Sequence, residues 1–195
     1  MRKLTVVLLP VVISLCSCFG YNRTPPPPPP KLVWGFKPVF TVDSSVLEVR
    51  VEQPRSVVYP GKIYAKGNLV FQTEVGHGIH VYDNSNPEDM KAVGFIKVLG
   101  CSEISIRGNY LYTNSFTDLV VVDISDWQQV KQTARIKNAF YQGIEAYQAV
   151  NLHQFIPPPE HGVFYDCSEF YFANVTSILT GWVRDSIYDN NCFYP

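Results

Sequence analysis

The sequence has almost no excess of charge of either sign: 16 lysine and arginine residues stand against 17 aspartate and glutamate residues, a formal net charge of −1. Proteins that bind nucleic acid need a basic surface to neutralise phosphates, so this balance argues against nucleic acid as a partner. The chain also lacks an apolar stretch of about 18 residues, so it predicts no membrane-spanning helix. With 46% hydrophobic residues over 195 positions, it predicts a small globular domain rather than a disordered chain.

The motifs of common catalytic sites are missing as well. The chain has no Gly-x-Ser-x-Gly, no phosphate-binding loop and no zinc-protease motif. His77 and His80 are three residues apart, a spacing that puts side chains on opposite faces of a strand, so we interpret them as a loop histidine and a strand-surface histidine. Residues 83–89 (DNSNPED) lack the glycine and the final glutamate of a calcium loop and predict a turn. We therefore expect no enzyme, no metal and no cofactor. The remaining carboxylates of interest are scattered, at Glu145, Glu160, Asp166 and Glu169.

The N-terminus has the pattern of an export signal. Arg2 and Lys3 precede a mostly aliphatic run at residues 4–15, which at about 1.5 Å per residue is too short to span a bilayer. The run ends in Leu15-Cys16-Ser17-Cys18, which resembles a bacterial lipobox with Cys18 as the modified residue. The alternative is an ordinary signal peptide cleaved near Ser17. We expect residues 1–17 to be the signal peptide and Cys18 to carry the lipid, because two or more acyl chains give stable anchoring.

A proline-rich tether follows, and we assign residues 18–37 to it. Residues 25–30 are six consecutive prolines, which adopt polyproline II at about 3.1 Å per residue and form a stiff spacer of about 19 Å. The alternative is a ligand for an SH3- or WW-type domain. The lipobox implies a compartment where such domains are rare, so the spacer interpretation is favoured.

The cysteine content is consistent with export. Besides Cys16 and Cys18 the chain has Cys101, Cys167 and Cys192, so at most one intramolecular disulfide forms among these three. We expect the pair Cys167–Cys192, which shares the C-terminal segment, and expect Cys101 to be a small buried residue. Nearby histidines do not complete a zinc-ligand pattern.

An internal repeat of about 40 residues occupies the middle of the chain. Residues 62–73 (KIYAKGNLVFQT) align without a gap on residues 103–114 (EISIRGNYLYTN) at an offset of 41. Residues 78–85 (GIHVYDNS) then align on residues 118–125 (DLVVVDIS) at an offset of 40. Each unit predicts four short strands. These are residues 62–66, 68–74, 78–83 and 91–98 in the first unit and residues 103–107, 109–115, 118–124 and 131–137 in the second.

Particular residues mark corresponding points of the two units. Glycine and asparagine tolerate positive φ and predict two-residue turns, and the aspartates that close the third strands can accept hydrogen bonds from backbone N–H groups ahead of them. The third strand of the second unit is aliphatic on both faces, which suits a strand covered on both sides. The signature positions are Gly67, Asn68, Asp83, Gly108, Asn109, Leu119, Val120, Val121, Val122 and Asp123.

Four short strands at this period are the pattern of a β-propeller blade. Residues 119–125 and the elements before them resemble the LVIVD-repeat proteins, exported bacterial proteins for which a propeller architecture is expected. The predicted fold class is therefore all-β, with two propeller-type four-stranded repeats in residues 38–142. Residues 143–195 are an incomplete third repeat or an irregular aromatic-rich excursion. Ile144 begins this unit, but residues 157–159 (PPP) interrupt it.

Two blades do not close a propeller. The chain is the N-terminal part of a longer protein, or several copies assemble, or the two units form a small sandwich; we favour the first. Residues 178–188 predict a hairpin or a blade edge. Two groups of aromatic residues are assigned mainly to packing between blades or to a buried core, with an exposed binding surface as the alternative for the second. They are Tyr64, Phe71, Tyr110 and Tyr112, and Phe164, Tyr165, Phe170, Tyr171 and Phe172.

These observations predict a protein of the bacterial cell envelope, anchored by lipid to a membrane, with the outer membrane as the first expectation. Its expected role is to bind or scaffold, with a protein or glycan as ligand and no catalytic activity. One alternative is part of an exported propeller enzyme whose site is completed by further blades. A second alternative is a non-functional truncated product.

Overall fold

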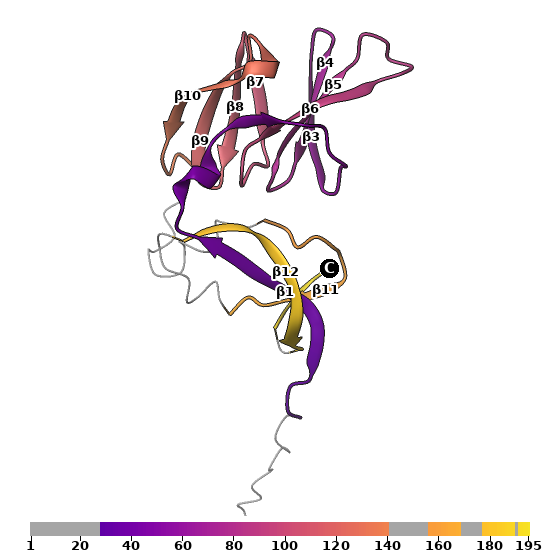
Figure 1. The fold of residues 1–195 in the computed structure, drawn as a ribbon, viewed down its shortest axis with the longest axis vertical. Coiled ribbons are helices and arrows are strands. Elements are labelled where there is room, and N and C mark those ends of the chain that lie inside the picture. Colours follow the sequence, from indigo (N-terminus) through magenta and orange to yellow (C-terminus); the bar gives the residue numbers. More distant parts are fainter. Residues whose placement is uncertain (1–27, 141–155, 169–176, 190) are drawn as a thin grey trace, which may run out of the picture. The chain divides into compact units, whose positions relative to one another are not determined.

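The computed structural model describes residues 28–140, 156–168, 177–189 and 191–195. The signal segment with Cys18, the start of the third unit at Ile144, and residues 170–172 therefore lie outside the described residues. The described chain is all-β: it contains thirteen strands in three sheets and two short 3-10 helices, η1 (Ser44–Leu47) and η2 (Trp127–Gln129). Figure 1 shows the three sheets as separate groups of arrows. In the described part of the chain no helix is long and apolar enough to cross a membrane.

The first repeat forms one antiparallel sheet, which we call blade 1. Its strands follow one another in space as they do in sequence, and a short extra strand, β2 (Arg50–Glu52), pairs with the last of them. All four strands predicted from the repeat are confirmed, with ends that differ by at most two residues. They are β3 (Pro60–Lys66), β4 (Leu69–Glu74), β5 (Gly78–Asp83) and β6 (Lys91–Lys97).

The second repeat forms a four-stranded antiparallel sheet in the same order, which we call blade 2. The predicted strands are confirmed here too. They are β7 (Ile104–Arg107), β8 (Tyr110–Ser115), β9 (Asp118–Asp123) and β10 (Lys131–Ile136).

The first turn of each blade is the two-residue loop that the Gly-Asn pairs predict. Lys66 pairs with Leu69 across one turn, and Arg107 pairs with Tyr110 across the other. Gly67 has φ +56° and Gly108 has φ +58°, whereas the asparagines that follow are not in the left-handed region. A positive φ at the first loop residue alone is the pattern of a type II′ turn, which glycine favours at that position.

The main core lies between the two blades. Blade 1 contributes Phe71, Ile79, Val81 and Ile96, and all four are fully buried. Blade 2 contributes Leu111, Val120 and Val122, likewise fully buried, because alternate side chains of β8 and β9 face blade 1. Cys101 joins this core as a free, buried thiol, as expected. Burial raises the pKa of the Cys101 thiol to about 12.

The third sheet combines the two ends of the described chain. The strand order is β12 (Ile178–Tyr188), β1 (Leu32–Thr41), β11 (Val163–Tyr165) and β13 (Cys192–Tyr194). β1 pairs antiparallel with β12 over its whole length and parallel with β11. This order is not the consecutive meander of blades 1 and 2.

Two sequence expectations change in this sheet. Residues 178–188 were expected to form a hairpin or a blade edge, and they form one eleven-residue strand at the sheet edge, because β1 offers a partner for its full length. β1 begins at Leu32, so ordered sheet takes in the last part of the range assigned to the tether.

A disulfide joins Cys167 to Cys192, the pair expected from the sequence. A second core cluster lies beside this sheet and consists of Leu99, Ile156, Ile178 and Leu179. Leu99 follows the last strand of blade 1, so this cluster connects the third sheet to the blades.

Candidate functional site

The two aspartates of the repeat signature act within turns. Asp83 Oδ1 accepts hydrogen bonds from the backbone N–H (2.8 Å) and the hydroxyl (2.6 Å) of Ser85. Asp123 Oδ1 accepts from the Ser125 N–H at 2.8 Å. The Ser85 side-chain and backbone hydrogen bonds lower the pKa of Asp83, and the Ser125 backbone hydrogen bond lowers that of Asp123. These carboxylates are used in holding the turn after the third strand, as the sequence predicts.

The loop after Asp83 forms a hydrogen-bonded turn, as the sequence predicts. Asn86 Oδ1 accepts from the Glu88 N–H at 3.2 Å, and the Asp89 N–H donates to the Asn86 carbonyl at 3.0 Å. Nowhere among the described residues do three or more histidine, cysteine or carboxylate side chains gather as a metal-ligand group.

The histidines differ from the sequence interpretation. His77 lies in the turn before β5, as expected. His80 was expected on a strand surface and is instead almost completely buried, with its Nε2 3.0 Å from Oε2 of Glu74. The strand-surface interpretation is wrong because residues that precede blade 1 cover this face of β5.

Glu74 holds these covering residues in place. Its carboxylate is fully buried at the end of β4 and accepts hydrogen bonds from the backbone N–H of Val58 (3.0 Å) and of Tyr59 (2.7 Å). A buried carboxylate needs such donors to offset the loss of hydration. Glu74 is not among the site residues predicted from the sequence. The available signal is an acidic residue that ends a strand whose other residues are apolar or neutral.

Aromatic groups complete this buried polar cluster. The His80 ring lies 5.0 Å from the Phe95 ring, edge to face, and 6.0 Å from the Tyr82 ring. The Arg55 guanidinium lies over Phe95, 4.9 Å from its centroid. His80 Nδ1 has no hydrogen-bond partner among the described residues. The cluster thus consists of Glu74, His80 and Arg55 together with these rings, and its contacts hold residues 55–59 against blade 1.

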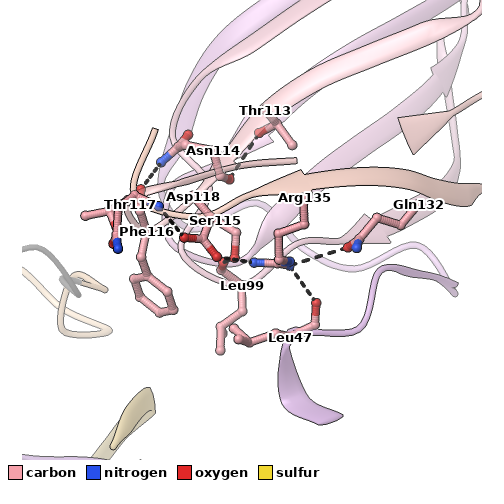
Figure 2. A network of polar contacts seen from close by, with 11 residues as sticks. Leu47, Leu99, Thr113, Asn114, Ser115, Phe116, Thr117, Asp118, Gln132 and Arg135 are labelled. Carbon is pink, nitrogen blue, oxygen red and sulfur yellow. Dashed lines mark hydrogen bonds and ion pairs between the residues drawn. The ribbon is translucent and has the colours of Figure 1, made fainter. Parts of the chain in front are cut away.

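A second polar network surrounds Arg135 on blade 2 (Figure 2). Its Nη1 bonds Asp118 Oδ2 at 3.0 Å, and its Nη2 donates to the Leu47 carbonyl at 3.0 Å. Asp118 Oδ1 also accepts from the Asn138 N–H at 2.9 Å. The network ties β9 and β10 to each other and to η1, so its charges serve to hold the structure together.

The aromatic residues divide between core and surface. Phe71 is fully buried, and Tyr64 packs on the main core and donates its hydroxyl to the Ile106 carbonyl at 2.7 Å. The prediction that these two side chains pack in the core is therefore confirmed. Tyr110 was also expected to pack and is instead 44% exposed. Phe164 and Tyr165 are half-buried in β11.

The scattered carboxylates do not pair into a site within the described residues. Glu160 faces Arg184 at 4.0 Å, and Asp166 accepts from the N–H and hydroxyl of Ser168. Glu145 and Glu169 lie outside the described residues.

Comparison with known families agrees with the repeat architecture. Residues 101–128 match the LVIVD repeat, and the match covers β7, β8 and β9 of blade 2. Neither a curated protein nor a solved structure shows significant similarity to the chain. Within the match, Leu119, Val120, Val122 and Asp123 occupy the signature, with Val121 at its central position. The chain therefore carries an LVIVD repeat in a propeller-type blade, and its described residues are all-β.

Proposed function

We propose that this chain is a lipid-anchored protein of the bacterial cell envelope whose LVIVD-type blades bind or scaffold another macromolecule. The observation that carries the proposal is the pair of antiparallel blades, one of them with an LVIVD repeat. It is supported by an N-terminal sequence with the pattern of an export signal and by the proline run that follows. The expected ligand is a protein or a glycan.

The roles of the polar side chains favour binding over catalysis. A catalytic acid or base needs access to a substrate. Glu74 and His80 are buried against residues 58–59, and Arg135 is bonded to a carboxylate and a carbonyl. In the described blades, Glu74, His80 and Arg135 thus hold neighbouring segments in place.

The anchor is tested by substitution of the two neighbouring cysteines. We expect Cys18→Ser to abolish incorporation of labelled palmitate and to move the chain from the membrane to the soluble fraction. Cys16→Ser is the matched control, because Cys16 has the bulky Leu15 before it and does not fit the lipobox frame. A Cys18→Ser chain that still incorporates palmitate or still pellets with membranes would refute the anchor.

A further inference from the structure

One face of the third sheet changes from buried to exposed along a single strand. Phe36 of β1 is buried (5% exposed), whereas Trp34, two residues earlier on the same face, is 69% exposed. Tyr165, which pairs with Phe36, belongs to the covered part of this face and packs against the second core cluster. The exposed part lies where β1 begins and β12 ends (Figure 1).

Three large side chains make up this exposed part, here called the sheet tip: Leu32, Trp34 and Tyr188. Leu32 pairs directly with Tyr188 across the two strands, and Trp34 pairs with Ser186, so the three side chains share one face of the sheet. Their exposed fractions are 64%, 69% and 52%. Apolar and aromatic side chains that gather on a surface in this way are typical of a contact with a protein or a membrane.

The chemistry of the sheet tip fits the interface of a bilayer. Tryptophan and tyrosine are enriched at the level of the lipid headgroups, because each has an apolar ring and one polar group. Of the charged residues of β12, Arg184 shares the face of the sheet tip, and Asp185 lies on the opposite face, where it pairs with Lys37 at 2.8 Å. Asp189 follows β12 and accepts a hydrogen bond from the Lys31 N–H at 2.9 Å. No carboxylate of β1 or β12 therefore interrupts the apolar tip.

The place of the sheet tip in the chain indicates which surface lies beside it. Leu32 comes two residues after the proline run and 14 residues after Cys18. A chain of that length spans at most about 50 Å, so a lipid on Cys18 keeps the tip close to a bilayer. The proline run fixes the distance between its own two ends but not the height of the sheet above the bilayer. The tip therefore reaches the bilayer surface when the run lies along that surface.

We propose that the sheet tip inserts into the headgroup region of the bilayer to which the chain is anchored. This rests on the lipid anchor of the proposed function and adds a second contact with the membrane. The anchor makes the second contact intramolecular, so three side chains suffice although they bind a bilayer only weakly by themselves. The consequence is a fixed orientation of the third sheet on the membrane, in place of a sheet that turns freely at the end of its tether.

Quenching by brominated phospholipids tests this insertion in the lipidated chain. In vesicles of phosphatidylethanolamine and phosphatidylglycerol with part of the lipid brominated, the wild type should lose most of the emission of Trp34. Trp34→Phe should remove this loss, because the other two tryptophans, Trp127 and Trp182, are half-buried. Tyr188→Ser should reduce the quenching at least about twofold. Tyr110→Ser is the matched control and should leave it unchanged, because Tyr110 is a similarly exposed tyrosine (44%) of blade 2.

A chain without lipid separates the sheet tip from the anchor. Residues 19–195, exported behind an ordinary cleavable signal peptide, should sediment weakly with the same vesicles, and Trp34→Ser should lower this partition at least about tenfold. Circular dichroism should show that all variants are folded.

Two results would overturn the proposal. One is a lipidated wild-type chain whose Trp34 emission is not quenched. The other is a lipid-free chain that ignores vesicles and uses Trp34 instead to sediment with cell-wall glycan or to form dimers. Both are distinguishable from a failure of the anchor, because the Cys18→Ser experiment measures palmitate on the chain and not the environment of Trp34.

Discussion

At the scale of single residues, the contribution of Glu74 to stability depends on the groups that surround its carboxylate. Glu74 and Glu103 are both acidic residues of strand-rich repeat units, yet one is fully buried and the other is exposed beside Lys62. The buried carboxylate satisfies two backbone donors and the ring of His80, so its removal leaves three polar groups unpaired. Groups left unpaired in this way carry the full cost of lost hydration.

The first prediction compares these two glutamates. Glu74→Ala should lower the free energy of unfolding by about 3 kcal/mol or more, because breaking a buried pair leaves uncompensated polar groups. Glu103→Ala should lower it by about 1 kcal/mol at most, as is usual for exposed ion pairs. Denaturant titration of both variants measures the difference; equal effects would contradict the buried role of Glu74.

The second prediction concerns pH and His77. Burial, and then the positive charge of Arg55, lower the pKa of His77 below its ordinary value of 6.5. The unfolded chain therefore binds this proton more readily, so His77 makes the folded state lose stability as pH falls from about 6.5 toward the lowered pKa.

His77→Gln should flatten that part of the stability profile, measured as thermal unfolding between pH 7.5 and pH 5. His161→Gln is the control, because His161 is exposed and lies outside the blades. A profile that keeps its slope in His77→Gln would show that another group is responsible.

At the scale of elements, the turn between the first two strands fixes the register of each blade. Gly108 has φ +58°, and a Cβ built on it meets no heavy atom within 4 Å. Any effect of an alanine there comes from the backbone conformation and not from a clash.

The third prediction follows from this turn. Gly108→Ala should lower the free energy of unfolding by about 1 kcal/mol, and Gly108→Asn by less, because asparagine tolerates the left-handed region. Gly67→Ala, at φ +56° in blade 1, should give a similar loss. Thermal or denaturant unfolding measures all three, and an alanine variant as stable as the wild type would contradict the assigned conformation.

The packing of the two blades also explains why the apolar pattern of β9 was predicted well from the repeat. The alternation of Leu119, Val120, Val121 and Val122 gives a strand with apolar residues on both faces, and one of these faces meets blade 1. The other face has no equivalent sheet packed on it among the described residues. Periodicity shows that a face is apolar but does not say what lies on it.

At the scale of the whole molecule, the third sheet depends on strands far apart in the sequence. β1 pairs with β12 across more than 130 residues, and the Cys167–Cys192 disulfide fixes β13 next to β11. A cross-link of this kind stabilises mainly by restricting the unfolded chain.

The fourth prediction is that this disulfide supports the third sheet. The bridge closes a loop with a sequence separation of 25 residues, so its loss should cost about 3 kcal/mol. Thermal unfolding with and without a reductant, and of the double variant Cys167→Ser/Cys192→Ser, measures this cost. Cys101 stays a free thiol in every sample, so a change caused by reductant in the double variant would point to another origin.

The sequence by itself determined the two blades, because each depends on local alternation, on Gly-Asn turns and on aspartates that bond residues two ahead. It also determined the family resemblance at blade 2, which the match at residues 101–128 confirms. Only the tertiary structure decided the pairing of β1 with β12, the burial of His80 and the exposure of Tyr110. These features depend on which distant segment covers a given face, and a short window of sequence carries no information about that partner.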